Sequence, residues 1–197
     1  TQYGKLLLLL VGTMLFMALV INPIIIFIYL RCNPYPLVFR CLRESGLTAF
    51  FTRSSAANIP VNMAMCEKLG MDKDFYSVSI PLGATINMDG TAIYQCVAAI
   101  FLAKCIGVDL TMGQMVTIVV TATLASIGTA GTSGAGMIML AMVLEAVGIP
   151  TTYIGIIYGI DRLFDMGRTA LNVVGDASCA ICVNHWEAKA AAQKAAK

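Results

Sequence analysis

The sequence predicts an all-α, polytopic membrane protein with two re-entrant helical hairpins and broken transmembrane helices that form an inverted repeat. Three observations lead to this fold class. The 197 residues are 58% hydrophobic and 12% charged, which is half of the roughly one quarter that is typical of soluble domains. Apolar stretches long enough to cross a bilayer alternate with shorter ones. Short segments rich in Gly, Ser, Thr, Asn and Asp interrupt these apolar stretches.

The rest of the composition argues against several other classes of protein. A formal net charge of +2 is too small to indicate a nucleic-acid partner. The seven cysteines are scattered and odd in number, so we expect no disulfide framework. Cys179 and Cys182 are expected to pack inside an apolar helix. With one histidine and no zinc-like Cys/His spacing, the sequence predicts neither a zinc site nor an organic cofactor.

Residues 5–30 form the first predicted transmembrane helix, because about 20 apolar residues cross a bilayer. The pair Asn22-Pro23 is expected to kink it. Three arginines follow closely: Arg31, Arg40 and Arg43. This positive charge places the carboxyl end of the helix in the cytoplasm. The apolar run is longer than the roughly 7–15 residues of a signal peptide core, and the start at Thr1 leads us to expect a fragment of a longer protein.

Residues 35–69 are predicted to form the first re-entrant hairpin. Their two apolar halves are each too short to cross a bilayer, and they flank a small polar tip at Arg53-Ser54-Ser55-Ala56. Pro60 is expected to break the second half soon after the tip. The alternative for this segment is an ordinary loop at the membrane interface.

Residues 75–107 have a second spanning length, which the segment ATINMDGTA at 84–92 interrupts near its middle. Residues 113–148 are predicted to form the second re-entrant hairpin, because SIGTAGTSGAG at its centre is too rich in Gly, Ser and Thr for a regular helix. Residues 151–183 provide a third spanning length. Residues 184–197 form an Ala/Lys-rich tail that is predicted to be cytoplasmic.

The order of these segments indicates an inverted repeat. A hairpin with a small-residue tip precedes a helix that carries Asn and Asp, and this pair of elements then recurs. Counting the crossings, the first hairpin enters from the cytoplasm and the second from outside. In such repeats the binding site lies near the bilayer midplane, where the broken helices meet.

The interruption at 84–92 predicts an ion site. Each unpaired backbone group costs several kcal/mol in hydrocarbon, and a central Asp adds roughly 2.5–3.5 kcal/mol. The segment is therefore expected to face protein, water or an ion. Freed carbonyls together with Asn87 and Asp89 are hard oxygen ligands, which suit a hard cation such as Na⁺. The alternative is a glycine-containing kink with a buried, hydrogen-bonded Asp.

The last predicted helix presents a polar face. Its members lie at spacings of three and four residues: Asp161, Asp165, Arg168, Thr169, Asn172 and Asp176. Arg168 can hold a carboxylate through two hydrogen bonds, and Asp165 can receive an ammonium group one turn away. Asp176 and Asn172 offer another oxygen cluster. The face has complementary charges for a zwitterion, and the alternative is a set of internal ion pairs that hold the helix in the bundle.

Four motifs resemble the signatures of the sodium-coupled dicarboxylate/amino-acid symporter family, the glutamate transporter family. They are, in order, TRSSAA, ATINMDGTA, ASIGTAG and DMGRTALNVVGD. The resemblance covers about residues 5–185. It implies that residues 1–197 are an incomplete transport domain, comprising the sixth transmembrane helix, hairpin 1, helix 7, hairpin 2 and helix 8. In the family this domain moves as an elevator against a scaffold, hairpin 2 is the extracellular gate, and the intact protein is a homotrimer.

The resemblance also implies roles for individual residues. The implied substrate-binding residues are Ser55, Thr91, Thr132, Gly136, Asp165, Arg168, Thr169 and Asn172, with Asp165 on the amino group and Arg168 on a side-chain carboxylate. One sodium ion would bind Gly83, Asn87, Asn172 and Asp176. A second would bind Thr85, Ser126, Ile127 and Thr129. A third would use Asn87 and Asp89 with residues of the absent third helix.

The main functional prediction is sodium-coupled symport of an acidic amino acid, aspartate or glutamate. Dicarboxylate carriers of the family lack the amino-binding Asp165, and neutral amino-acid carriers lack Arg168. A buried guanidinium without a carboxylate partner would also be costly. Gln95 stands where animal glutamate carriers have a Glu linked to proton and potassium coupling, which implies coupling to sodium alone.

Other functions are less consistent with the sequence. Within the family, the alternative is a sodium-coupled serine/threonine symporter, because TRSSAANIPVN also resembles the bacterial serine/threonine carriers. An ion channel is the alternative of another class, although it would need polar residues along a whole pore. An intramembrane enzyme is not expected, because His185 lies in the tail and no base is evident near Ser55. We expect a multi-pass protein of the plasma or inner membrane, in contact with lipid.

Overall fold

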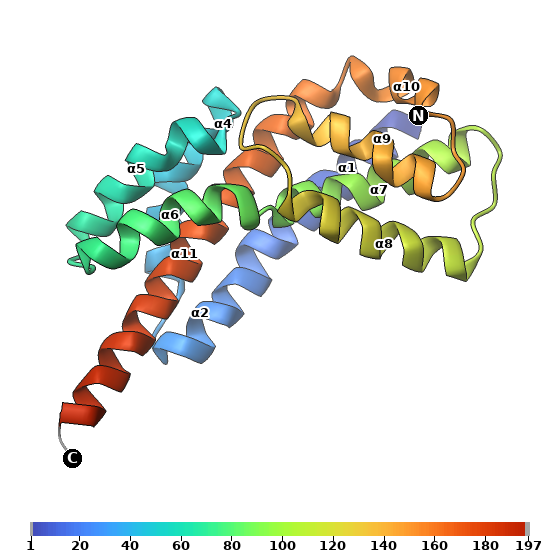
Figure 1. Cartoon of the computed structure of the whole chain (residues 1–197). Helices are drawn as coiled ribbons and strands as arrows, with labels where there is room; N and C mark the ends of the chain where they lie inside the picture. Colours follow the sequence, from blue (N-terminus) through green and yellow to red (C-terminus); the bar gives the residue numbers. More distant parts are fainter. Residues whose placement is uncertain (1, 196–197) are drawn as a thin grey trace.

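Helices are the regular elements of residues 2–195, the part of the chain that the computed structural model describes, and no strand occurs among them. The all-α class is therefore confirmed. The longest helix, α11 (Asp161–Ala195), runs through the whole fold (Figure 1). Helices α4, α5, α6 and α7 pack against α11, and α8 and α9 pack against α7 and against each other.

The first helix contains a π-helical turn caused by a proline. Helix α1 (Gln2–Phe16) continues through the turn η1 (Met17–Ile21) into α2 (Asn22–Leu30). The ring of Pro23 cannot donate a hydrogen bond to the Leu19 carbonyl and would collide with it in a regular helix. The Asn22 amide instead donates to Met17, five residues back, and the Tyr35 hydroxyl donates to the Leu19 carbonyl at 3.4 Å. The kink expected at Asn22-Pro23 is thus a π bulge in a continuous helix.

Residues 35–68 form a pair of helices joined by a sharp turn. The first member of the pair is a continuous helical rod made of α3 (Tyr35–Cys41), η2 (Leu42–Gly46) and α4 (Leu47–Thr52). The second member is α5 (Ser55–Lys68). Arg53 ends the rod in the left-handed conformation, with φ of 54°. Ser54 caps α5 by accepting a hydrogen bond from the Ala57 amide at 3.1 Å. This turn is the polar tip expected from the sequence.

The predicted break at Pro60 is wrong, because α5 continues through it to Lys68. Proline removes one backbone hydrogen bond and costs about 3 kcal/mol in a helix interior. Pro60 lies on the exposed side of α5, so its ring does not disturb the packed side. On the packed side Asn58 and Asn62 are buried and hydrogen-bonded. The hydrogen bonds of Asn58 and Asn62 offset the backbone hydrogen bond that Pro60 removes.

The next apolar stretch consists of two helices, α6 (Lys73–Ile86) and α7 (Asp89–Cys105). The backbone leaves the helical conformation at Asn87 (φ −84°, ψ 74°) and Met88 (φ −116°, ψ 41°). The first turn of α7 then finds a partner on α11, since the Gly90 amide donates to Asn172 Oδ1 at 2.8 Å. Tertiary contact with α11 therefore satisfies backbone that the interruption leaves free.

A second helix pair follows, α8 (Met112–Ile127) and α9 (Ala135–Ala146). Thr111 and Gln114 form a capping box at the start of α8. The irregular centre expected at 126–136 is non-helical over 128–134, and Gly134 ends it with a φ of +83°, which favours glycine.

The last predicted segment differs from the structure at both ends. The prediction of one helix over 151–183 is corrected, because the turn η3 (Thr151–Ile154) and the short α10 (Gly155–Tyr158) precede α11. Glycines and β-branched threonines in 151–159 disfavour a helix there. Helix α11 also continues to Ala195 through most of the predicted tail at 184–197. Ala, Lys, Glu and Gln are strong helix formers, which explains the extension.

Two helical stretches among the described residues are long and apolar enough to cross a bilayer. They are Gln2–Leu30, with 29 residues, and Lys73–Cys105, with 33 residues. Large apolar side chains stand out from the first stretch, and Leu8 is 77% exposed. A surface of this kind is typical of a helix that contacts lipid.

Buried polar side chains attach the first helix pair to α11. Asn58 Nδ2 donates to Ser45 Oγ at 2.6 Å, and the Ser45 hydroxyl donates to Asn62 Oδ1. Asn62 Nδ2 donates to the Val173 carbonyl at 3.1 Å and lies 3.4 Å from Asp176 Oδ2. Because these groups are buried, each depends on its partners.

We predict that Asn62→Leu lowers the free energy of unfolding by about 1–3 kcal/mol, because it leaves buried partners of Asn62 unpaired. Unfolding in a denaturing detergent, followed by circular dichroism, measures this change. Thr123→Val is the control, since the exposed Thr123 hydroxyl only donates to Val119 within α8. Equal stability of the two variants would contradict a structural role for the network.

Candidate functional site

The tips of the two helix pairs meet beside the interruption between α6 and α7. The Ala56 amide and the Ser54 hydroxyl both donate to the Gly131 carbonyl at 2.9 Å. A Cβ atom at Gly131 would lie 3.0 Å from Ala56 N and 3.1 Å from Ala84 O. Only glycine therefore allows the three segments to approach this closely.

These tips close over a small cavity of about 10 Å³. All eight residues predicted to bind substrate line it: Ser55, Thr91, Thr132, Gly136, Asp165, Arg168, Thr169 and Asn172. Arg53, Met88 and Thr129 also reach it. A volume of this size accommodates about one water molecule. The structure thus brings the predicted residues together in a closed arrangement, with no room for an amino acid.

A buried ion-pair cluster surrounds the guanidinium of Arg168, whose side chain is 2% exposed. Arg168 Nη1 lies 3.3 Å from Asp161 Oδ1, and Arg168 Nε donates to Asp165 Oδ1 at 3.0 Å. The Tyr94 ring stacks on the guanidinium, with 4.2 Å from Cζ to the ring centroid. Both carboxylates come from α11 itself, one and two turns before the arginine. Arg168 therefore has its counter-charges within the chain.

One nitrogen of Arg168 retains bonding capacity. Nη2 is 2.9 Å from Asp165 Oδ1, close enough for an ion pair. The direction is unsuitable for a hydrogen bond, and among the described residues Nη2 has no other partner. Gly136 on α9 faces this group, since a Cβ there would lie 2.9 Å from Arg168 Cζ. A ligand atom in the cavity can therefore accept a hydrogen bond from Nη2.

The second oxygen of Asp165 joins α11 to both tips. Asp165 Oδ2 accepts hydrogen bonds from Ser133 Oγ at 3.1 Å and from the Gly134 amide at 3.2 Å. Arg53 Nη1 lies 3.9 Å away. Donors of the protein thus occupy the position where an ammonium group is predicted to bind.

The cluster is electrically balanced without any ligand. Asp161 and Asp165 carry two negative charges, and Arg53 and Arg168 carry two positive charges. A ligand that adds no net charge preserves this balance. A ligand with an extra carboxylate adds a buried negative charge, which is costly unless a cation accompanies it.

Sequence reasoning missed several members of this cluster. It placed Asp161 on the polar face without a role, although its seven-residue spacing from Arg168 puts the two side chains on one side of the helix. Arg53 was recognised only as part of a tip. Ser133 and Tyr94 come from other elements, and nothing in their local sequence indicates contact with Asp165 or Arg168.

Asn172 connects α11 to the start of α7. Its Nδ2 donates to Thr91 Oγ1 at 2.9 Å and lies 3.0 Å from Met88 Sδ. The backbone carbonyl of Asn172 accepts a hydrogen bond from Asn87 Nδ2 at 3.0 Å. The interruption and the polar face of α11 therefore form one connected site.

Oxygen atoms gather on the other side of the interruption. Gly83 faces the Asp176 carboxylate so closely that an added Cβ would overlap it. Gly175 likewise faces Asn87 Nδ2, and its Cβ would lie 3.5 Å from Asp89 Oδ1. Asp89 Oδ1 is buried and has no hydrogen-bond partner among residues 2–195. The buried carboxylate of Asp176 and the buried Oδ1 of Asp89, beside non-helical backbone, are a donor set that suits a hard cation such as Na⁺.

The residues of the second predicted sodium site are less closely connected to one another. Ser126 and Thr129 are buried, and their hydroxyls donate to the backbone carbonyls of Thr123 and Ala125 in α8 at 2.8 Å. Ile127 is 44% exposed. Thr85 is exposed and its hydroxyl donates within α6 to Leu82. In the described part of the chain, no hydrogen bond joins Thr85 to the other three residues.

Several known proteins are similar in sequence to this chain. A serine/threonine transporter SstT from Bifidobacterium adolescentis is 51% identical over 180 residues, which cover 89% of this chain and 42% of the relative. A serine/threonine transporter SstT from Streptococcus agalactiae is 48% identical over 175 residues, which cover 87% of this chain and 44% of the relative. The chain therefore spans less than half the length of these curated relatives.

A family model gives the assignment. The model for the sodium:dicarboxylate symporter family matches residues 1–186, which is nearly the whole chain. The match confirms the resemblance inferred from the four sequence motifs. Proteins of this family are transporters and not enzymes. This chain belongs to the sodium:dicarboxylate symporter family.

Proposed function

We propose that this chain forms the substrate- and sodium-binding part of a sodium-coupled symporter for a small neutral amino acid, serine or threonine. The observation that carries the proposal is the balanced cluster around Arg168. Asp161 and Asp165 neutralise the guanidinium within the protein, so that no substrate carboxylate is needed for this purpose.

We therefore favour the serine/threonine symporter, which was the alternative within the family, over the main prediction of an acidic amino-acid symporter. The main prediction assumed that a buried Arg168 needs a carboxylate from its substrate. Asp161 removes that requirement, because it lies 3.3 Å from Arg168 Nη1. The two relatives described above are named serine/threonine transporters, which supports the same choice.

In the proposed complex the substrate enlarges the cavity between the tips. Its ammonium group binds Asp165 in place of Ser133 and Gly134. Its polar groups bind among the remaining predicted residues: Ser55, Thr91, Thr132, Gly136, Arg168, Thr169 and Asn172. Because the cavity holds only about 10 Å³, the segment at 128–134 must move before an amino acid can enter. This is consistent with the gate implied for hairpin 2.

The proposed sodium sites lie around the interruption between α6 and α7. Gly83, Asn87, Asn172 and Asp176 form the first, and Asn87 and Asp89 contribute to another. The proximity of Gly83 to Asp176 and the unpaired Asp89 Oδ1 support these two. Thr85, Ser126, Ile127 and Thr129 form the remaining site. A bound sodium ion would neutralise buried carboxylate charge.

The proposal includes the wider architecture implied by the family. The helix pairs in 35–69 and 113–148 are re-entrant hairpins related as an inverted repeat, and residues 1–197 are an incomplete transport domain. It works as an elevator in the homotrimer of a longer protein. It lies in a cell membrane, which the longer protein crosses several times. The meeting of the two tips at Gly131 supports this arrangement.

Binding calorimetry on the purified protein tests the substrate. We expect L-serine to bind in sodium and not when choline replaces sodium, and L-aspartate to bind at least tenfold more weakly than L-serine, a difference of about 1.4 kcal/mol. Tighter binding of L-aspartate would restore the acidic amino-acid prediction. Failure of both amino acids, and of threonine, to bind in sodium would leave the polar face with a structural role only.

Asp161→Asn should change the substrate preference. The variant keeps the size of the side chain but removes one carboxylate from Arg168, whose guanidinium then gains from a carboxylate on the substrate. We predict that the affinity for L-aspartate relative to L-serine rises at least tenfold in the same calorimetric assay. Asp109→Asn, at an exposed loop position, is the matched control. An unchanged ratio in Asp161→Asn would show that Asp161 does not set selectivity.

Gly83→Ala should weaken sodium binding, because the new methyl group would overlap the Asp176 carboxylate. We predict that half-maximal L-serine binding requires at least tenfold more sodium, measured by titrating sodium at fixed L-serine. Gly12→Ala is the control, since a Cβ at this helical glycine has no neighbour within 4 Å. Identical sodium titrations for the two variants would argue against a cation at Gly83 and Asp176.

A further inference from the structure

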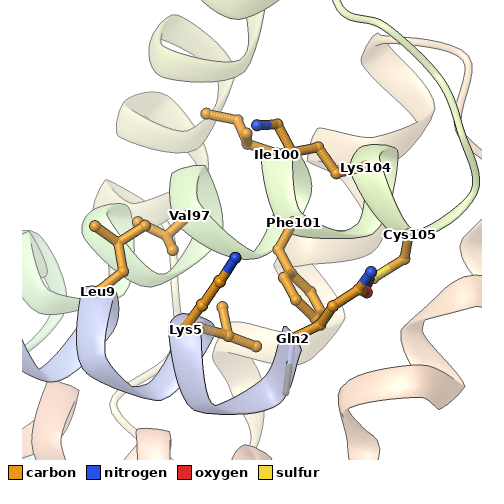
Figure 2. A pocket seen from close by; sticks show the side chains of 9 residues that line it. Gln2, Lys5, Leu9, Val97, Ile100, Phe101, Lys104 and Cys105 are labelled. Atoms are coloured by element: carbon orange, nitrogen blue, oxygen red, sulfur yellow. Dashed lines mark hydrogen bonds between the residues drawn. The ribbon is translucent and has the colours of Figure 1, made fainter.

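A groove between the first turns of α1 and the last turns of α7 lies apart from the substrate and sodium sites (Figure 2). Its cavity measures about 380 Å³. The residues that line it are Gln2, Lys5, Leu6, Leu9, Val97, Ile100, Phe101, Lys104 and Cys105. None of them belongs to the predicted substrate or sodium sites.

The groove has apolar walls and a basic rim. Leu6 and Phe101 form part of the wall, and Leu6 is only 2% exposed. Lys5 on α1 and Lys104 on α7 are both exposed. Figure 2 shows the two side chains on adjacent helices around the same pocket. A ligand that suits this groove has an apolar body and a negatively charged end.

The charges of these lysines are not neutralised by the protein. Neither Lys5 nor Lys104 has an ion pair among the described residues, and no carboxylate lines the groove. A second basic hollow, beside Arg43 and Lys68, differs in this respect. There Glu44 pairs with Lys68 at 3.4 Å and with Arg40 at 2.9 Å. Of these two hollows, therefore, only the α1–α7 groove combines unpaired ammonium groups with apolar walls.

The groove lies at one end of both apolar stretches long enough to cross a bilayer. Gln2–Leu30 begins there and Lys73–Cys105 ends there. Tyr3 lies beside it, with its ring centroid 6.1 Å from that of Phe101 and its hydroxyl donating to the Ile156 carbonyl at 3.0 Å. Tyrosines of this kind are enriched at the membrane–water interface, and lysines near helix ends extend towards the headgroups.

We propose that this groove binds an anionic glycerophospholipid of the phosphatidylglycerol class. One acyl chain packs between α1 and α7 against Leu9, Val97 and Phe101, and the phosphate lies between Lys5 and Lys104. A phosphate between two unpaired ammonium groups forms charge-assisted hydrogen bonds with both of them. The proposal depends on residence in a membrane and not on the identity of the transported substrate.

Native mass spectrometry of the purified chain in mixed micelles tests the headgroup. Dioleoyl phosphatidylglycerol and dioleoyl phosphatidylcholine are offered at equal concentration. We expect at least fivefold more phosphatidylglycerol than phosphatidylcholine on the wild-type chain, and equal amounts on the double variant Lys5→Gln/Lys104→Gln. The matched control, Arg31→Gln/Lys73→Gln, removes two positive charges from the opposite ends of the same apolar stretches and should retain the preference.

Two further measurements test the groove itself. Leu9→Trp, which fills the groove without changing its charge, should reduce retention of both lipids. Glycerol 3-phosphate, which has the anionic group but no acyl chain, should not displace the lipid at tenfold excess. Equal retention of both lipids by the wild-type chain, loss of the preference in the control variant, displacement by glycerol 3-phosphate, or full retention by Leu9→Trp would each overturn the proposal. Circular dichroism of every variant confirms that it is folded before lipids are compared.

Discussion

The buried cluster of Asp161, Asp165 and Arg168 is the interaction on which the rest of the structure depends. A guanidinium with 2% exposure is tolerated only when carboxylates accompany it. Both carboxylates lie on α11, so the helix brings its own counter-charges into the interior. Asp165 then extends the cluster to Ser133 and Gly134. The electrostatic requirement of one arginine thus sets the positions of α11 and of the segment that covers the cavity.

Small residues allow the backbone to approach these charged groups. Gly83 faces Asp176, Gly136 faces Arg168, and Gly131 lies between Ala56 and Ala84. At each of these positions a methyl group would meet an atom at or below about 3 Å. The glycines therefore act as contact points between helices as well as weak points within them. This explains why interrupted helices, which leave backbone groups free, can still form a packed interior.

The charge balance around Arg168 also bears on the proposed substrate selectivity. In the proposed function an arginine alone would indicate an acidic substrate, whereas an arginine with two carboxylates of its own would not. The proposal therefore attributes selectivity to the sum of the buried charges around Arg168 rather than to any one residue. The lysines at the α1–α7 groove are the opposite case, because they have no ion pair among the described residues and, in the proposed lipid complex, a phosphate supplies one.

The sequence by itself determined the all-α class, the family and the group of residues around the cavity, because hydropathy, interrupted apolar stretches and four motifs are properties of the linear chain. It also predicted the polar face of α11 from spacings of three and four residues. Only the tertiary structure decided that Pro60 lies inside a continuous helix, that α11 begins at Asp161, and that Asp161, Tyr94 and Ser133 surround Arg168 and Asp165. These features depend on contacts between segments far apart in the chain, where packing and burial outweigh local propensity.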